Sequence, residues 1–250
     1  PCVYRIHELP DKEKLQEFSA FASNLGLELK GRAENIHPKQ LAQLLDEAER
    51  IGIKPLISMV MLRAMSKARY SETDVGHFGL SLKHYCHFTS PIRRYPDLIV
   101  HRLVTLMLEG KLDEGTINRY NETLHDACEH CSFCERNAME TERAVYDMKK
   151  AEYMSDYIGC KYKGIISGIT PIGIFVSLPN TIEGMIRISN MKRFFIADPE
   201  RYRAIAQDNG EILKLGEQIE IIVLAADIEM GKIEFGLCDT NTETGKANCP

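Results

Sequence analysis

The chain has 250 residues, 44% of them hydrophobic and 27% charged, with a formal net charge of −5. These fractions are close to the averages of folded globular proteins, which excludes a disordered chain and a fibrous repeat. The negative net charge argues against a protein that binds nucleic acid with its whole surface. A local basic channel inside an acidic shell remains compatible with it.

No apolar run approaches the ~18 residues that a membrane span needs, so we expect no membrane partner. Eight cysteines without a secretory signal fit the thiols of a cytoplasmic protein better than a disulfide framework. The chain opens with Pro1 and has no initiator Met there, so we expect further sequence upstream.

Helices are predicted for most of the first 158 residues. Asp11 is a suitable N-cap for the first, Gly26 can end it, and Pro38 and Pro55 can each open another helix. An irregular stretch rich in His, Arg and aromatic residues follows, which is typical of a ligand-binding loop. A further helix is predicted from Pro96, and then a long polar helix from Ile117 to Tyr157, interrupted once near the cysteines.

The cysteines of this long helix raise the question of a metal site. Cys128, Cys131 and Cys134 are three residues apart, so each step rotates the side chain by about 300° and the thiols drift off one helix face. A structural zinc site needs four converging ligands. Packed thiols are therefore the favoured interpretation, and a zinc-dependent interaction protein stays open as an alternative.

Beyond Gly159 the pattern changes from helical to strand-like. Five β-rich stretches separated by turn residues predict a small Greek-key barrel of the OB type: 162–169, 173–178, 185–188, 218–225 and 232–237. The predicted fold class is α+β, with a mostly helical part at 1–158, a five-stranded OB-fold barrel at 159–239 and a polar, disordered tail at 240–250.

Residues 87–102, HFTSPIRRYPDLIVHR, resemble the signature of the RNB family. The resemblance extends from Val3 to Arg143, and the chain is identified as a portion of a ribonuclease R or ribonuclease II type enzyme, with the ribonuclease R branch favoured. It implies a hydrolytic 3′→5′ exoribonuclease that releases nucleoside 5′-monophosphates from single-stranded RNA with bound Mg²⁺. It further implies a monomeric protein without a small-molecule cofactor.

The resemblance makes Arg93 the first catalytic candidate. A guanidinium offers fixed, paired donors to phosphate oxygens, which suits the charge that develops during phosphodiester hydrolysis. Glu142 matches a glutamate that the family carries near its active site, although a solvated helix face explains it equally well. The other RNA-binding candidates of this part either contact the RNA backbone or pair with nearby carboxylates: Thr89, Ser90, Arg94, Tyr95, His101 and Arg102.

The predicted barrel resembles the S1 type of RNA-binding domain. The resemblance implies RNA contacts by Tyr162, Phe175, Arg187 and Lys232. Arg187 stands where many members have His, and Ile172 where many have an aromatic residue. Stacking on bases is therefore expected to be weaker than usual and contact with phosphates stronger.

One departure from the family concerns the metal. The family binds Mg²⁺ through a cluster of the form Asp-Leu-Asp-Asp, and this chain has no Asp-x-Asp-Asp sequence. We therefore predict no metal site in this chain, Mg²⁺ ligands upstream of it, and little or no hydrolysis by this piece alone. A non-catalytic single-stranded RNA-binding module is the alternative.

Overall fold

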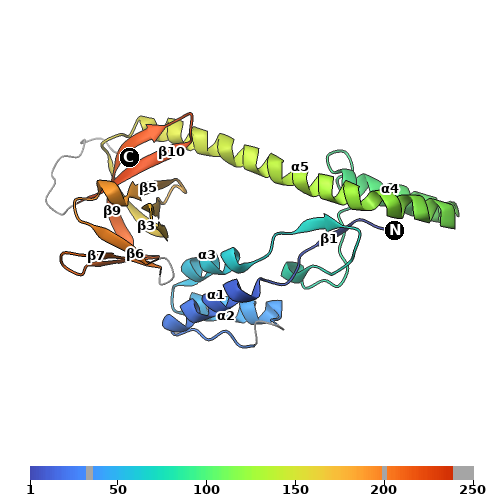
Figure 1. Ribbon diagram of the computed structural model, residues 1–250, viewed down its shortest axis with the longest axis horizontal. Helices are drawn as coiled ribbons and strands as arrows, with labels where there is room; N and C mark the ends of the chain where they lie inside the picture. The colour runs from blue at the N-terminus through green and yellow to red at the C-terminus, as the bar shows by residue number, and fades with distance from the viewer. Residues whose placement is uncertain (32–35, 199–201, 239–250) are drawn as a thin grey trace. The chain divides into compact units, whose positions relative to one another are not determined.

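The computed structural model describes residues 1–31, 36–198 and 202–238 (Figure 1). The chain divides into two compact units, Pro1–Ala138 and Met139–Pro250. The division falls inside a helix, whereas the sequence analysis drew its domain boundary after that helix. The tail predicted to be disordered lies outside the described residues.

Three helices follow one another in the first unit: α1 (Lys12–Asn24), α2 (Pro38–Arg50) and α3 (Lys54–Ala64). Asp11 caps α1 as predicted, because its carboxylate accepts a hydrogen bond from the Lys14 N–H at 3.0 Å. Pro38 opens α2 and Pro55 lies in the first turn of α3. Both α1 and α2 pack against α3 through their buried apolar faces.

The remainder of the first unit surrounds a second group of buried side chains. Strand β1 (Tyr4–Ile6) pairs antiparallel with β2 (Arg69–Ser71), and the short 3₁₀ turn η2 (Phe78–Leu80) leads into the loop before helix α4 (Tyr95–Leu108). The core joins these segments to the start of α5 (Glu114–Ser155) through Val3, Tyr70, Ile99, Val100, Leu103, Leu124 and Cys128. Residues more than 120 positions apart in sequence thus fix the base of the predicted ligand-binding loop.

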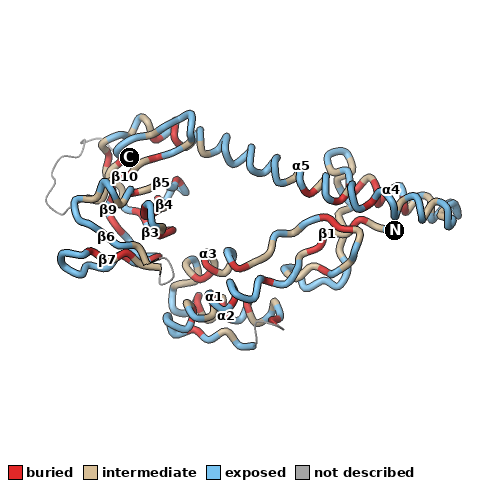
Figure 2. The backbone as a smooth tube through the Cα atoms, in the orientation of Figure 1, coloured by how far each residue is buried: buried red, intermediate tan, exposed pale blue. Residues whose placement is uncertain are grey.

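Helix α5 runs without a break, so the predicted interruption near the cysteines is wrong. The sequence between Gly115 and Gly159 contains neither Gly nor Pro, so nothing in it disrupts the helical backbone. Residues 136–146 are exposed all around the helix (Figure 2). No helix in the described part of the chain combines the length and apolarity that crossing a membrane requires.

The second unit contains the predicted five-stranded barrel. Its strands are β3 (Lys161–Thr170), β4 (Gly173–Ser177), β5 (Glu183–Arg187), β9 (Gln218–Asp227) and β10 (Lys232–Leu237), closed in the order β10-β5-β4-β3-β9. Alternate residues fill the interior, including the fully buried Ile174, Ile186 and Phe235. The α+β fold class and the OB-type barrel are confirmed.

A small sheet inserted between β5 and β9 was not predicted. After the 3₁₀ turn η3 (Ile188–Asn190), β6 (Phe195–Asp198), β7 (Arg203–Ala206) and β8 (Ile212–Lys214) form a three-stranded antiparallel sheet. These strands have three or four residues each. Such a length is too short for the alternation of apolar and polar residues to be recognised among the neighbouring charged residues.

The cysteines fulfil the expectation of free thiols in part. Six described cysteines form no disulfide bond: Cys2, Cys86, Cys128, Cys131, Cys134 and Cys238. Cys160 is disulfide-bonded, so the expectation fails at that position.

Candidate nucleic-acid interface

The loop before α4 is a closed turn. The backbone N–H groups of Arg93 and Arg94 both donate to the Ser90 carbonyl oxygen, at 3.3 and 3.0 Å. Pro91 restricts the backbone inside this turn, since its ring fixes one of the two backbone dihedrals. The segment that the sequence analysis singled out is therefore an ordered turn at the N-terminus of a helix.

Asp97 in the first turn of α4 ties this loop to the helix. Its side chain is 0% exposed. Its Oδ1 accepts hydrogen bonds from the Ser90 N–H at 2.7 Å and from Arg94 Nε and Nη2 at 3.1 and 2.8 Å. Its Oδ2 is buried and has no hydrogen-bond partner among the described residues. Of the two roles considered for Arg94, pairing with a carboxylate is the one that the geometry favours.

The tip of the loop points away from the core. Ile92 is 102% exposed, and Arg93 is exposed with no ion pair to any residue that the structure describes. Thr89, Tyr95 and Arg102 are exposed as well, and Ser90 is half-buried. An unpaired guanidinium beside exposed hydroxyl groups is suited to bind a phosphate.

His101 is held by the loop. Its Nε2 donates to the Phe88 carbonyl oxygen at 2.8 Å, and the two rings are stacked with centroids 4.2 Å apart. This geometry suits a role for His101 in supporting Phe88 better than a direct position in an RNA channel. Phe88 itself is exposed.

A partly buried polar network adjoins the loop at His87. Arg5 forms a 2.6 Å ion pair with Glu135 and covers the ring of Tyr70 at 4.7 Å, and the Tyr70 hydroxyl is hydrogen-bonded to His87 Nδ1 at 3.0 Å. Burial, and next the charge of Glu135, raise the pKa of Tyr70 to about 12. Burial, and next the charges of Arg94 and Arg5, lower the pKa of His87.

This network and Asp97 escaped the sequence analysis as a functional unit. Its members come from four separate segments, so no spacing in the sequence indicates them. The available signal was that His87 and Asp97 both lie inside the recognised signature.

Glu142, the second catalytic candidate, lies in the other unit. It is exposed on α5 and has no ion pair with any described residue. Its assignment stays a prediction.

The described residues do not fit a bound metal ion. Within residues 1–31, 36–198 and 202–238, no three His, Cys, Asp or Glu side chains are grouped so that they could hold one. Asp74 and Asp97 are instead paired with His84 and Arg94. Cys128 is buried in the core of the first unit while Cys134 is exposed, an arrangement that does not suit the zinc alternative.

One outer face of the barrel carries three of the four predicted RNA contacts. Phe175 on β4 is directly opposite Met185 on β5, and Met185 is opposite Glu234 on β10, so the three side chains form a row across the strands. Arg187 and Lys232, each two residues along from this row, project from the same face. We call these five residues the barrel row.

The charges of the barrel row are partly compensated. Arg187 Nε lies 3.4 Å from Glu234 Oε2, and Asn190 donates to Glu234 Oε1 at 2.6 Å. Lys232 is exposed and forms no ion pair with the residues that the structure describes. Glu234 thus competes with any phosphate for Arg187, which qualifies the expected strong phosphate contact.

Tyr162 lies outside the barrel row. It is opposite Ile221, whose side chain is fully buried, so Tyr162 projects toward the interior side of the barrel wall. Burial, and next the proximity of Tyr153, raise the pKa of Tyr162. Its predicted role in RNA binding stays a prediction.

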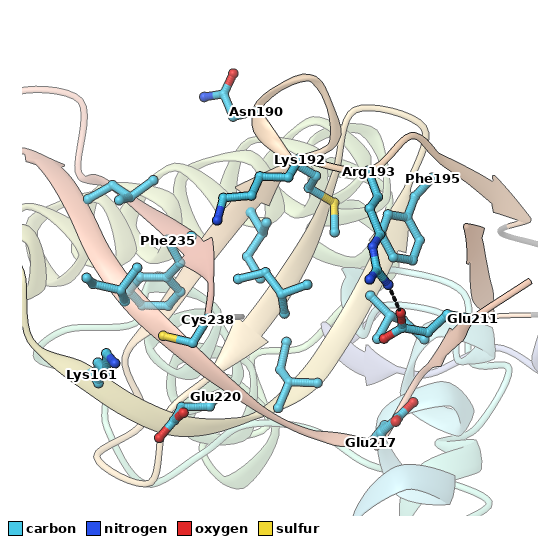
Figure 3. Close-up of a pocket in the computed structure, with 18 residues that line it drawn as sticks. Lys161, Asn190, Lys192, Arg193, Phe195, Glu211, Glu217, Glu220, Phe235 and Cys238 are labelled. Carbon is cyan, nitrogen blue, oxygen red and sulfur yellow. Dashed lines mark hydrogen bonds and ion pairs between the residues drawn. The ribbon is translucent and has the colours of Figure 1, made fainter. Parts of the chain in front are cut away.

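A hollow of about 680 Å³ lies elsewhere in this unit (Figure 3). Apolar side chains such as Ile222, Leu213 and Phe195 form much of its lining, with Lys192 and Glu220 among the charged residues around it. None of the predicted site residues lines it, so it is separate from the barrel row.

Two family models match the chain. One, described as the RNB domain, matches residues 1–110, and the other, described as the S1 RNA binding domain, matches residues 156–237. Among curated relatives, Ribonuclease R 1 of Lactococcus lactis is 42% identical over 236 residues, which are 94% of this chain and 29% of the relative. Ribonuclease R of Aquifex aeolicus is 38% identical over 96% of this chain and 34% of the relative.

Solved structures of RNase R also match this chain over most of its length. The apo form of Mycoplasma genitalium RNase R superposes with a TM-score of 0.88 at 28% identity, covering 95% of this chain and 38% of that one. The same enzyme in complex with ribose-methylated single-stranded RNA also has a TM-score of 0.88. The chain spans about a third of the length of the curated relatives that it matches.

The pKa of His87 predicts how the stability of the first unit depends on pH. Because the folded state depresses this pKa below its ordinary value of 6.5, the unfolded chain takes up the proton first as the pH falls. The contribution of His87 to the free energy of unfolding is therefore complete above the ordinary pKa. It is lost as the pH falls through the folded-state pKa. Replacing His87→Gln should therefore make the fall in urea midpoint between about pH 7 and pH 5 shallower.

The matched control is His130→Gln, which removes an exposed imidazole from α5. If the urea midpoint depends on pH identically in wild type and His87→Gln, folding does not lower the pKa of His87.

Proposed function

Because this chain belongs to the RNB family and carries an S1 RNA binding domain after its RNB domain, we propose that it is part of a hydrolytic 3′→5′ exoribonuclease of the ribonuclease R type. The parent protein degrades single-stranded RNA to nucleoside 5′-monophosphates. The observation that carries the proposal is the closed loop that leaves Arg93 exposed and unpaired within the described part of the chain.

Arg93 supplies positive charge to the reacting phosphate. Hydrolysis of a phosphodiester places additional negative charge on the phosphoryl oxygens, and a fixed guanidinium stabilises that charge with two parallel donors. The loop is suited to this role because its backbone is already ordered, so little backbone entropy is lost when the phosphate binds. The hydroxyls of Thr89, Ser90 and Tyr95 contact the RNA backbone beside it.

The barrel row holds the RNA strand outside the reaction centre. Phe175 offers a ring for a base, and Lys232 and Arg187 offer charge to phosphates. We propose further that the parent protein is a cytoplasmic monomer that uses Mg²⁺ and no small-molecule cofactor. Its Mg²⁺ ligands come from residues other than those described here, because the described residues do not form a metal site.

The match to an S1 RNA binding domain supports a second candidate. In it, the chain is a non-catalytic module that only holds single-stranded RNA. The two candidates differ in what Arg93 does: in the enzyme it lowers the barrier to hydrolysis, and in the module it contributes to binding alone.

Replacing Arg93→Ala in the protein of full natural length tests the catalytic role. The rate of mononucleotide release in the presence of Mg²⁺ should fall by about 10²–10³, the usual effect of removing a donor that stabilises developing charge. RNA binding, measured by fluorescence anisotropy, should be largely retained. Arg136→Ala, which removes an equal and exposed charge from α5, is the control; an Arg93→Ala protein as fast as this control would rule out the catalytic role.

The 250-residue chain by itself should release little or no mononucleotide from a labelled single-stranded RNA with Mg²⁺. The reason is that two-metal hydrolysis needs converging carboxylates. Product is measured by thin-layer chromatography beside the protein of full natural length. Processive release by the isolated chain would contradict this expectation.

Replacing Glu234→Gln should strengthen RNA binding by this chain. The change removes a negative charge from the barrel row and frees Arg187 for a phosphate. The slope of log K against log salt should steepen by about 0.7, the value for one more phosphate contact on a single strand. Glu220→Gln, an equal charge change in the hollow of Figure 3, is the control; equal slopes in both variants would show that Glu234 does not restrain Arg187.

A further inference from the structure

We infer that Asp97 is a positioning residue for Arg93, and that it acts through the backbone of the loop without touching RNA. The inference rests on the proposed function, because it presupposes that Arg93 acts on the phosphate. It adds a residue whose effect is on the placement of a charge and not on the charge itself.

Arg93 depends on its backbone for its direction. The guanidinium forms no ion pair with any residue in the described ranges, and the side chain is exposed. A long side chain without contacts samples many rotamers, so the position of its Cα and Cβ is all that the protein controls. Whatever holds the loop backbone therefore holds Arg93.

Asp97 closes that backbone into a ring. Ser90 is tied at both of its backbone groups: its N–H donates to Asp97 Oδ1, and its carbonyl accepts from the N–H groups of Arg93 and Arg94. The Arg94 side chain returns to the same Oδ1 atom. The turn that carries Arg93 is thus attached at both ends to one carboxylate oxygen.

The bonding pattern differs from that of a residue that merely caps a helix. A capping carboxylate would accept from the free N–H groups of the first helical turn. The donors to Asp97 are instead the Ser90 N–H, which lies in the loop, and the side chain of Arg94, the N-cap residue. Asp97 therefore restrains the loop, in addition to any favourable interaction of its charge with the helix dipole.

The unpartnered oxygen of Asp97 provides a sharp test. All three hydrogen bonds end on Oδ1, while Oδ2 is buried without a partner among the described residues. An asparagine can direct its amide oxygen at the same three donors and place its NH₂ group where Oδ2 lies. Asp97→Asn should therefore keep the loop closed, whereas Asp97→Ala removes the acceptor.

The experiment measures kcat and KM for mononucleotide release from single-stranded RNA by the protein of full natural length. In Asp97→Ala we expect kcat to fall by about 10- to 100-fold, because misplacing a reacting group by about 1 Å costs up to ~10² in rate. KM should change less than kcat, since the barrel row, which holds the strand outside the reaction centre, is intact. Asp97→Asn should restore most of kcat. A kcat in Asp97→Asn as low as in Asp97→Ala would overturn the inference.

Two further variants separate positioning from general destabilisation. Ser132→Ala removes a buried hydroxyl that accepts from the Tyr70 N–H and donates to the Cys128 carbonyl, so it should lower the melting temperature and leave kcat unchanged. Pro91→Gly loosens the turn without touching Asp97 and should lower kcat, with only a modest fall in melting temperature from the greater entropy of the unfolded chain. If Asp97→Ala does not fold, an unchanged kcat in Pro91→Gly overturns the inference.

Arg93→Ala, measured in parallel, separates the proposed function from the positioning role of Asp97. Activity unchanged in Arg93→Ala would defeat the proposed function. Activity lost in Arg93→Ala but unchanged in a folded Asp97→Ala protein would defeat the positioning role alone.

Discussion

The hydrogen bonds that the Ser90 N–H and the Arg94 side chain donate to the buried Asp97 Oδ1 are the interactions on which the signature loop depends. A carboxylate with no exposed surface is costly unless charged and polar donors surround it. Three donors converge on Asp97 Oδ1, two from Arg94 and one from the Ser90 backbone. Opening the loop would leave this charge buried and unpaired, so the loop stays closed and Arg93 stays at its tip.

The core of the first unit makes those hydrogen bonds possible. Val3 and Tyr70 pack beside Ile99 and Val100 of α4, which buries the start of the helix from which Asp97 projects. Arg5 then covers the ring of Tyr70 while it pairs with Glu135. The loop is therefore supported by segments from the beginning, the middle and the end of the unit.

The two candidate RNA-contacting surfaces use positive charge in different ways. The loop presents Arg93 without a counter-ion in the described residues, which suits a group that must act on a developing charge. On the barrel, Glu234 offsets Arg187, which suits a surface that must release the strand as readily as it holds it.

Sequence pattern alone determined much of the local structure. Asp11, Pro38 and the spacing of apolar residues predicted the first helices, since capping and periodicity act over a few residues. Alternation of apolar residues between turns likewise predicted all five barrel strands. Recognition of the signature placed Arg93 in its loop, and the resemblance to the S1 RNA-binding domain placed Phe175 on a strand of the barrel. The short strands β6, β7 and β8 were missed because their pattern is too brief to be distinguished.

Only the tertiary structure decided which charges are available. Arg94 and Arg187 read alike in the sequence as basic residues near a predicted site, yet each is paired with a carboxylate, Asp97 and Glu234. Tyr162 similarly proved to face the inner side of the barrel wall. Such pairings depend on barrel closure, strand register and the rotation of a helix relative to its loop. Those quantities are set by packing between segments distant in the chain, which no local pattern encodes.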